Sequence, residues 1–261
     1  LYNRHKYLKR TINYWLKYNV RLLILDGSNK KFENKCLESN KITYIHDQRG
    51  LRTRLLSSSK YVKTEFIILS SDDEFYLPSA LSNCIKFLLE KPNYTSCGGR
   101  ALGFLIENNK IIGMQQYLEL KDLCLDQNDA KERITYHFSN YVPAHIYSVI
   151  RSETWNKISK DIFKKKYNFN DYIELQLEFF VLLLGKSKII PDLMWLRNKQ
   201  ISTISFDLPT IKINLWWYDK NFKKEKILFL NQMKNSCENL LKNEKNKFKE
   251  DMISYLFEIY I

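Results

Sequence analysis

Helix-like segments alternate with short apolar runs over the first 90 residues of this chain. The apolar runs are continuous and do not alternate with polar residues, which is typical of parallel strands buried on both faces. This order of segments predicts an α/β fold with a mostly parallel central sheet flanked by helices. We expect strands at residues 20–25, 41–46 and 65–70, and helices at residues 7–18, 51–62 and 78–90.

The second half of the chain has a less regular pattern. A strongly apolar segment from Asp171 to Leu184 predicts a helix that ends at Gly185, and Lys/Glu/Asn-rich sequence beyond Asp219 predicts more helix. We therefore expect a main domain over residues 1–205 and a C-terminal helical extension over residues 206–261. Further strands are expected at residues 94–104, 110–114 and 188–196, and within residues 136–150.

Positive charge is concentrated near the start of the chain. The whole sequence has 42 Lys and Arg against 29 Asp and Glu, a net charge of +13, and residues 1–66 carry 15 Lys and Arg against 5 Asp and Glu. Such a segment favours partners that carry phosphate, namely phosphorylated ligands, anionic lipid or nucleic acid. A surface that is charged only for solubility would show the same excess.

The cysteines and the apolar runs indicate the cellular compartment. None of the five cysteines forms a C-x-x-C pair and their number is odd, which argues against a zinc site or a disulfide framework. The longest uninterrupted apolar run, residues 179–184, is too short to cross a bilayer, and no signal peptide is visible. These features favour a cytoplasmic protein.

Three consecutive acids, Asp72, Asp73 and Glu74, directly follow the strand expected at residues 65–70. Neighbouring carboxylates repel one another, and carboxylates together with substrate phosphate are what Mg²⁺ or Mn²⁺ binds. The other interpretation is the start of a helix at Pro78, where acids interact favourably with the helix dipole.

Asp26 follows the first expected strand, and the carboxyl ends of parallel strands meet at one sheet edge. Asp26 would either bind a nucleobase or a ribose hydroxyl at this edge, or cap a turn.

Three acids also share one stripe of the helix expected at residues 171–184, namely Asp171, Glu174 and Glu178. The other faces of that helix are apolar, and charged groups are rarely buried without a partner. One interpretation is a general base whose pKa is tuned by burial and by like charge. The other is a set of salt bridges to Lys or Arg.

Basic residues that could bind phosphate occur along the chain, and Arg4 and Arg54 are the favoured candidates. The four histidines show no metal-ligand spacing, although His145 could face a cleft. No P-loop, G-x-G-x-x-G or G-x-S-x-G motif is present, which argues against a P-loop kinase, a dehydrogenase and an α/β-hydrolase. The remaining basic candidates are Lys6, Arg49, Arg52 and Arg197.

Four segments together resemble inverting glycosyltransferases of family 2, which have the GT-A fold. Residues 1–10 are similar to the family's TYNR opening, which follows a first strand that would lie before Leu1. Residues 23–28 resemble its vvDgS strand end, and residues 66–74 resemble its strand with the DxD motif. Residues 169–174, followed by Gly185, resemble the late acidic helix that supplies the base. The resemblance covers about residues 1–200.

This resemblance implies a role for each matching residue. Asp72, Asp73 and Glu74 would hold Mn²⁺ or Mg²⁺, and Asp171 or Glu174 would deprotonate the acceptor hydroxyl. Ser70 stands where many relatives have the first Asp of the motif, and Asn170 stands where they have Glu. The residues implied to bind the nucleotide sugar are Asn3, Arg4, Asp26, Arg54 and Asp72.

The function expected from these features is metal-assisted transfer of a sugar, with inversion, from a nucleotide-sugar donor to an acceptor hydroxyl. The family's common setting is bacterial surface polysaccharide or glycoconjugate synthesis, with a sugar or lipid-linked glycan as acceptor. The basic surface would suit peripheral contact with an anionic inner membrane. The alternatives are a nucleotidyltransferase and a basic nucleic-acid-binding module. The latter is less favoured because it leaves the acidic sheet edge unexplained.

Overall fold

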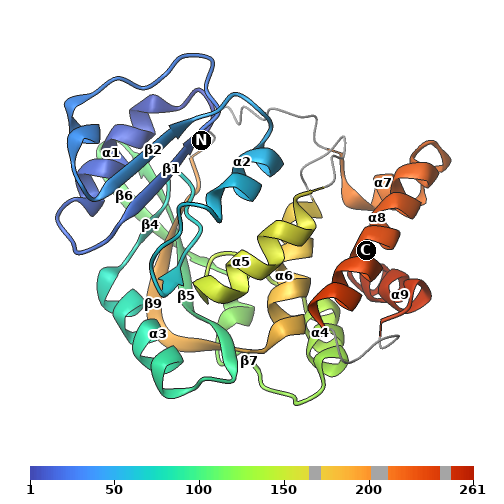
Figure 1. Ribbon diagram of the computed structural model, residues 1–261. Helices are drawn as coiled ribbons and strands as arrows, with labels where there is room; N and C mark the ends of the chain where they lie inside the picture. The colour runs from blue at the N-terminus through green and yellow to red at the C-terminus, as the bar shows by residue number, and fades with distance from the viewer. Residues whose placement is uncertain (165–171, 201–210, 242–247) are drawn as a thin grey trace.

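A mixed β-sheet runs through the centre of the molecule, with helices packed on both of its faces (Figure 1). The computed structural model describes residues 1–164, 172–200, 211–241 and 248–261. The longest ladder of the sheet is parallel and joins β5 (Tyr94–Glu107) to β9 (Lys186–Asn198). A second parallel pair, β1 (Leu22–Asp26) and β2 (Ile42–His46), forms a two-stranded sheet. The α/β class and the flanking helices expected from the sequence are confirmed.

Short strands and one hairpin complete the larger sheet. Its strand order is β3-β8-β5-β9-β4, with β6 added to β5 and β7 added to β9. All of these additional pairings are antiparallel. The strands concerned are β3 (Phe66–Ile67), β4 (Phe75–Tyr76), β6 (Lys110–Gln116), β7 (Cys124–Leu125) and β8 (Val149–Arg151).

Two helices share a hydrophobic core on one side of the sheet. α3 (Pro78–Glu90) begins at its proline, because a proline in the first turn lacks only an N–H that would have no helical partner. α1 (His5–Trp15) buries Ile12 and Trp15 against the strands. α2 (Leu51–Ser58) is shorter than the segment expected at residues 51–62.

The strand expected at residues 65–70 is mostly absent, because only Phe66 and Ile67 pair with a neighbouring strand. Side chains bind the carbonyls that follow. The Tyr76 hydroxyl donates to the Leu69 carbonyl, and Thr11 of α1 donates to the Asp72 carbonyl. Hydrogen bonds of this kind replace the ladder, so the acidic segment is a loop attached to α1.

Of the range 136–150, within which strand is expected, only the last two residues are strand. Residues up to Ser139 belong to α4 (Ala130–Ser139), and strand begins only at Val149. Asp129 starts this helix by accepting hydrogen bonds from two backbone N–H groups of its first turn. Ile134 and Phe138 lie four residues apart on its buried face.

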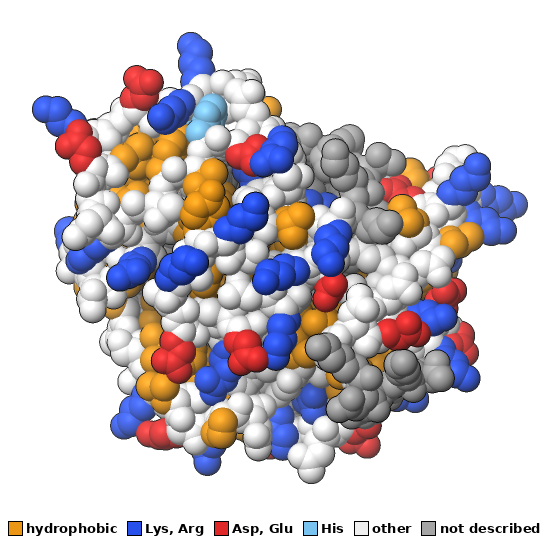
Figure 2. Space-filling model, in the orientation of Figure 1, with side chains coloured by type: hydrophobic (Ala, Val, Ile, Leu, Met, Phe, Trp, Pro, Cys, Tyr) orange, Lys and Arg blue, Asp and Glu red, His pale blue; other side chains and the backbone are white. Residues whose placement is uncertain are grey.

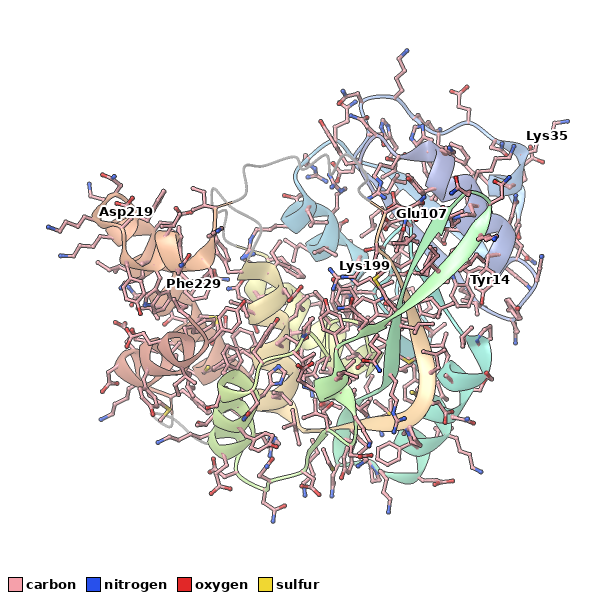
Figure 3. The ribbon with its side chains drawn as sticks, turned by 180° about the vertical axis from the view of Figure 1, so that it is seen from behind. Tyr14, Lys35, Glu107, Lys199, Asp219 and Phe229 are labelled. Carbon is pink, nitrogen blue, oxygen red and sulfur yellow. The ribbon has the colours of Figure 1, made fainter. Side chains whose placement is uncertain are left out.

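A layer of helices covers the opposite side of the sheet and contains the largest core. Its centre is α6 (Tyr172–Leu184), which is buried on nearly all sides and packs against α5 (Ser152–Ile162) and α4. The C-terminal helices α7 (Ile213–Tyr218), α8 (Lys223–Leu240) and α9 (Glu250–Tyr260) share this core. Phe229 of α8 lies within it (Figure 3). No helix in the described ranges combines the length and apolar character that a membrane span requires.

We expect Phe257→Ala to lower the free energy of unfolding by about 3–5 kcal/mol, because the ring is fully buried against Phe138, Phe179 and Trp217 of three other helices. The matched control is Tyr255→Ala on the same helix, where 57% of the residue is exposed and the loss should stay below about 0.5 kcal/mol. Urea unfolding measures both. Equal, small losses would show that α9 does not belong to this core.

Candidate active site

Arg4 binds two carboxylates of the acidic loop at once. One terminal nitrogen of Arg4 lies 3.2 Å from Asp72 Oδ1, and the other lies 2.6 Å from Asp73 Oδ2. Arg4 is the residue that immediately precedes α1, and its guanidinium also lies over the Tyr7 ring. This arginine therefore offsets part of the repulsion between the neighbouring acids. From the sequence alone, the candidates for that role are a divalent ion and a helix dipole.

Asp72 retains one free acceptor atom. Its Oδ2 is buried and has no hydrogen-bond partner among the described residues. Burial raises the pKa of Asp72 above its ordinary value, although Arg4 opposes this effect. Buried acceptors are nearly always satisfied in folded proteins, so this oxygen is the atom of the loop best suited to bind a cation.

Glu74 points to different partners. Its Oε2 accepts a hydrogen bond of 2.8 Å from the Trp195 indole N–H, and its Oε1 lies 3.7 Å from Nε of Arg197. Burial raises the pKa of Glu74, whereas the hydrogen bond from Trp195 lowers it. Burial is the larger effect, and the pKa is about 7. In the described part of the chain, the three acids of this loop do not form a group of converging metal ligands.

Asp26 is fully buried at the end of β1. It accepts hydrogen bonds from the Ser28 backbone N–H at 2.8 Å and the Tyr44 hydroxyl at 2.6 Å, and it lies 3.0 Å from His5 Nε2. Burial raises the pKa of Asp26, but these hydrogen bonds outweigh it and hold the pKa below its ordinary value. The contact with Ser28 is an Asx turn, so Asp26 does cap the turn that follows β1. Sequence reasoning missed His5 and Tyr44, because neither is near Asp26 in the sequence.

The first residues of the chain connect Asp26 with the acidic loop. The backbone N–H of Asn3 donates to the Ser28 hydroxyl, and its side-chain oxygen accepts from the Asn29 backbone N–H. Arg54 of α2 is buried against Gly27, where any Cβ would overlap the guanidinium.

The acids of α6 have partners other than the Lys or Arg that one interpretation required. Glu174 accepts a hydrogen bond of 2.6 Å from the Tyr141 hydroxyl. Burial raises the pKa of Glu174 to about 7, and the charge of Glu178 adds to this, while the bond from Tyr141 lowers it. Glu178 is fully buried and accepts the backbone N–H groups of His145 and Ile146. Asp171 lies outside the described residues.

Tyr147 lies near both groups of acids. Its ring stacks on Trp195 with the centroids 4.1 Å apart. Burial raises the pKa of its hydroxyl, and so do the charges of Glu174 on α6 and of Glu74 and Asp73 in the acidic loop. The late helix and the acidic loop therefore face one region of the molecule, although about 100 residues separate them. No motif marked Tyr147 in the sequence.

Several expected basic or cleft residues have other partners. His145 does not face a cleft: it is 1% exposed and lies 2.8 Å from the Ser187 hydroxyl. Arg52 is buried and binds the Gln176 side chain, so it is not free for phosphate. Arg49 pairs with Asp47 at the surface. Arg197 lies beside Glu74 and over the Tyr117 and Trp195 rings.

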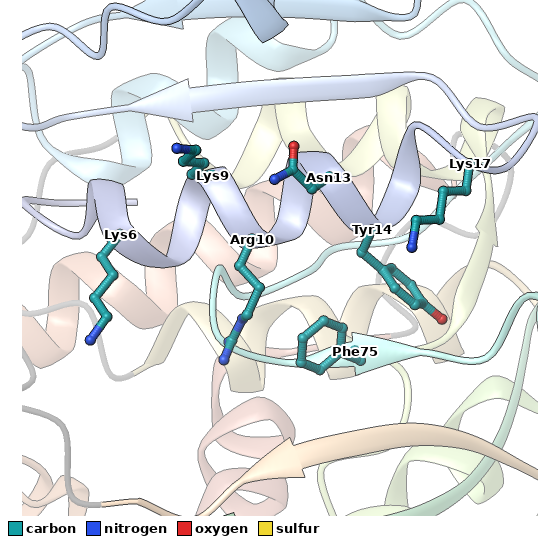
Figure 4. A pocket seen from close by; sticks show the side chains of 7 residues that line it. All are labelled: Lys6, Lys9, Arg10, Asn13, Tyr14, Lys17 and Phe75. Carbon is teal, nitrogen blue, oxygen red and sulfur yellow. The ribbon is translucent and has the colours of Figure 1, made fainter.

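A basic groove of about 450 Å³ runs beside α1 (Figure 4). One end of it is next to the acidic loop, because Arg10 donates a hydrogen bond of 3.0 Å to the Asp73 carbonyl and lies over the Phe75 ring. Positive charge is also evident elsewhere, since Lys and Arg side chains form a row across the face shown in Figure 2. The groove is lined by Lys6, Lys9, Arg10, Asn13, Tyr14, Lys17 and Phe75.

Comparison with known proteins places this architecture in a family. The family model described as glycosyl transferase family 2 matches residues 1–170, whereas a search of curated proteins finds no match. Among solved structures, S. aureus TarS 1–349 is similar over 100% of this chain and 88% of that chain, with 14% identity and a TM-score of 0.55. TarS in complex with UDP-GlcNAc is similar over 92% and 69%, with 14% identity and a TM-score of 0.55.

A third solved structure shows the same likeness. The mannosyltransferase PcManGT from Pyrobaculum calidifontis, in complex with GDP-Man and Mn²⁺, is similar over 98% of this chain and 67% of that chain, with 9% identity and a TM-score of 0.50. At such identities these likenesses establish the shared GT-A fold. Together with the family match over well over half of the sequence, they show that this chain belongs to glycosyl transferase family 2 and is a glycosyltransferase.

Proposed function

We propose that this protein transfers a sugar from a nucleotide-sugar donor to an acceptor hydroxyl with inversion of the anomeric configuration. The observation that carries this proposal is that Tyr147 lies near both groups of acids. Its ring stacks on Trp195, which donates a hydrogen bond to Glu74 of the strand-end loop. Burial raises the pKa of the Tyr147 hydroxyl, and the charge of Glu174 of α6 adds to this. A donor site and a base on opposite sides of one region are what a single displacement needs. Structural neighbours in complex with UDP-GlcNAc and with GDP-Man support a nucleotide sugar as the donor.

The donor nucleotide would bind where the first residues of the chain meet β1. Asp26 remains ionised there, and a carboxylate accepts hydrogen bonds from a base N–H or from ribose hydroxyls. Arg54, packed on Gly27, and Asn3, which binds the loop after β1, shape this side. Arg4 lies next to it, where a guanidinium suits the diphosphate.

A divalent ion, Mn²⁺ or Mg²⁺, fits Asp72 and Asp73 better than it fits Glu74. Asp72 has a buried oxygen without a partner, whereas both oxygens of Glu74 face Trp195 or Arg197. Such an ion supplies Lewis-acid stabilisation of the leaving nucleoside diphosphate. That PcManGT is described in complex with Mn²⁺ supports this choice of ion.

The base would be Glu174 or Asp171. Glu174 has a pKa of about 7, which is close to the value at which a general base works best near neutral pH. It would accept the proton of the acceptor hydroxyl while that oxygen bonds to the anomeric carbon. As this bond forms, the bond from the anomeric carbon to the donor phosphate oxygen breaks, and the nucleoside diphosphate leaves with that electron pair.

The acceptor would carry phosphate or lie at an anionic surface. Lys6 and Arg10 lie one turn apart on α1, Lys17 follows the end of that helix, and all three line the groove, where like charges repel. Within the described residues, neither Lys6, Lys9 nor Lys17 pairs with an acid. A phosphate-bearing sugar or lipid-linked glycan would relieve this repulsion.

The proposed setting is synthesis of a bacterial surface polysaccharide or glycoconjugate by a cytoplasmic enzyme that contacts the inner membrane peripherally. Within the chain, residues 1–205 would form the catalytic domain and residues 206–261 its helical extension. The match of the family model to residues 1–170 supports the first part of this division.

We expect Asp72→Asn to reduce sugar transfer by ~100-fold or more, because stabilisation of the leaving group by a metal is worth several kcal/mol. Folding should be retained, since Arg4 keeps its bond to Asp73. A thermal-shift screen of nucleotide sugars with Mn²⁺ identifies the donor first. Release of nucleoside diphosphate then measures turnover, and pyrophosphate as the product would indicate a nucleotidyltransferase. The control is Glu119→Gln at an exposed acid; full activity of Asp72→Asn would remove the metal-site proposal.

We expect Glu174→Gln to be more stable than the parent protein at pH 8, by ~1–2 kcal/mol once partial solvent exposure is allowed for. Because the folded pKa of Glu174 is raised from 4.5 to about 7, the unfolded chain ionises first, and stability is lost as pH rises between these values. Urea unfolding at several pH values measures the difference, which should vanish near pH 4.

The same variant tests the base. Loss of a general base lowers kcat by about 10²–10⁴-fold, so comparison of Glu174→Gln with Asp171→Asn assigns the role. Normal turnover in both variants would mean that neither acid is the base. A pH-independent stability difference would instead contradict the raised pKa of Glu174.

We expect the triple change of Lys6, Lys9 and Lys17 to Gln to raise KM for a phosphate-bearing acceptor by about 100-fold, at about 1 kcal/mol for each basic side chain. KM for the donor should not change. The matched control removes the same charge from exposed Lys220, Lys223 and Lys224 of the C-terminal region. Vesicles of anionic and of neutral lipid, tested by co-sedimentation, distinguish a membrane surface from a soluble phosphate glycan. Equal effects of the two triple variants on KM would show that the groove is not a specific acceptor site and acts only through the net surface charge.

A further inference from the structure

Three buried side chains lie close together one helical turn from Glu174, a candidate for the proposed base. His137 comes from α4, His145 from the segment between α4 and β8, and Glu178 from α6, and each is at most 1% exposed. One possible ligand atom from each lies within 4.8 Å of the others. We propose that these residues bind a second divalent metal ion, of the zinc class, at a structural site separate from the acidic loop.

Glu178 presents one oxygen to both imidazoles. Its Oε1 accepts the backbone N–H groups of His145 at 2.9 Å and Ile146 at 2.8 Å, which fixes the carboxylate. Its Oε2 lies 3.0 Å from Nε2 of His137 and 3.8 Å from Nε2 of His145. Ligand atoms about 3.4 Å apart are what a tetrahedral ion with bonds of about 2.1 Å requires, so small side-chain shifts would complete the geometry.

The histidines have the free nitrogens that a metal needs. His145 contacts the Ser187 hydroxyl through Nδ1 at 2.8 Å, and Ser187 in turn lies 2.7 Å from the Ser96 hydroxyl. Its Nε2 has no hydrogen-bond partner among the described residues, and neither has Nδ1 of His137, while Nε2 of His137 faces only Glu178 Oε2 there, at 3.0 Å and without hydrogen-bond geometry. A histidine that binds a metal usually has its other ring nitrogen anchored by a hydrogen bond, and Ser187 provides that anchor for His145.

The chemistry of this donor set differs from that of the acidic loop. Two imidazoles and one carboxylate suit Zn²⁺ and related transition metals, whereas carboxylates with phosphate suit Mg²⁺ or Mn²⁺. A bound ion would join α4, the segment that carries Tyr147 and the helix that carries Glu174. It would thereby hold both sides of the proposed reaction region in place without contacting a substrate.

The experiment measures Zn²⁺ binding to the full chain, after removal of metal with a chelator, by calorimetry and by thermal shift. The Asp72→Asn/Asp73→Asn double variant is the background, so that the acidic loop does not contribute. We expect one tight equivalent of Zn²⁺ and a raised melting temperature. His137→Gln and Glu178→Gln should abolish this binding, Ser187→Ala should weaken it by about 10–100-fold, and His46→Gln, outside the cluster, should leave it intact.

X-ray absorption of the zinc-loaded background protein gives a readout that does not depend on whether core variants fold. Two histidine nitrogens and carboxylate oxygen in the zinc shell would support the site. An all-oxygen shell, or no uptake of Zn²⁺, would overturn the proposal and leave Glu178 with the two imidazoles as its only side-chain partners in the described structure. Zinc binding that survives in folded His137→Gln and Glu178→Gln would overturn it as well.

Discussion

The bridge from Arg4 to Asp72 and Asp73 determines how the proposed donor site is built. A single guanidinium binds both carboxylates, while Arg10 and Thr11 of the same helix bind the backbone carbonyls of Asp73 and Asp72. The acidic loop is therefore fixed by α1 and not by a strand ladder. Because charge-assisted hydrogen bonds are roughly twice as strong as neutral ones, the loop can retain adjacent acids and still leave Asp72 Oδ2 open.

The second constraint is the burial of α6. Glu174 and Glu178 lie one turn apart on the same helix, yet their pKa values move in opposite directions. Burial acts on both, but two backbone N–H groups and two imidazoles favour ionised Glu178, whereas Glu174 has the Tyr141 hydroxyl alone as a hydrogen-bond donor in the described structure. Pairs of acids separated in this way are typical of sites where one carboxylate is structural and the other reacts.

Local sequence patterns predicted most of the helices and strands, and they failed where side chains from distant segments intervene. The helix at residues 78–90 has the predicted bounds, because its proline start and apolar face are local signals. The strand at residues 65–70 was wrong beyond Ile67, because Tyr76 and Thr11 bind the carbonyls that a ladder would have used. For the candidate site, the sequence indicated Asp26 and the acidic loop, but not Tyr147, whose position depends on its stacking on Trp195.

The sequence by itself determined where carboxylates follow apolar runs, which helix carries buried acids and where positive charge gathers. These are properties of residue order, and they were sufficient to identify the family resemblance. Only the tertiary structure decided which acid binds Arg4, which turns to Trp195 and which carboxylate of α6 has its pKa raised to about 7. The reason is that hydrogen bonds, ion pairs and desolvation act over a few ångströms, between atoms that chain order leaves far apart.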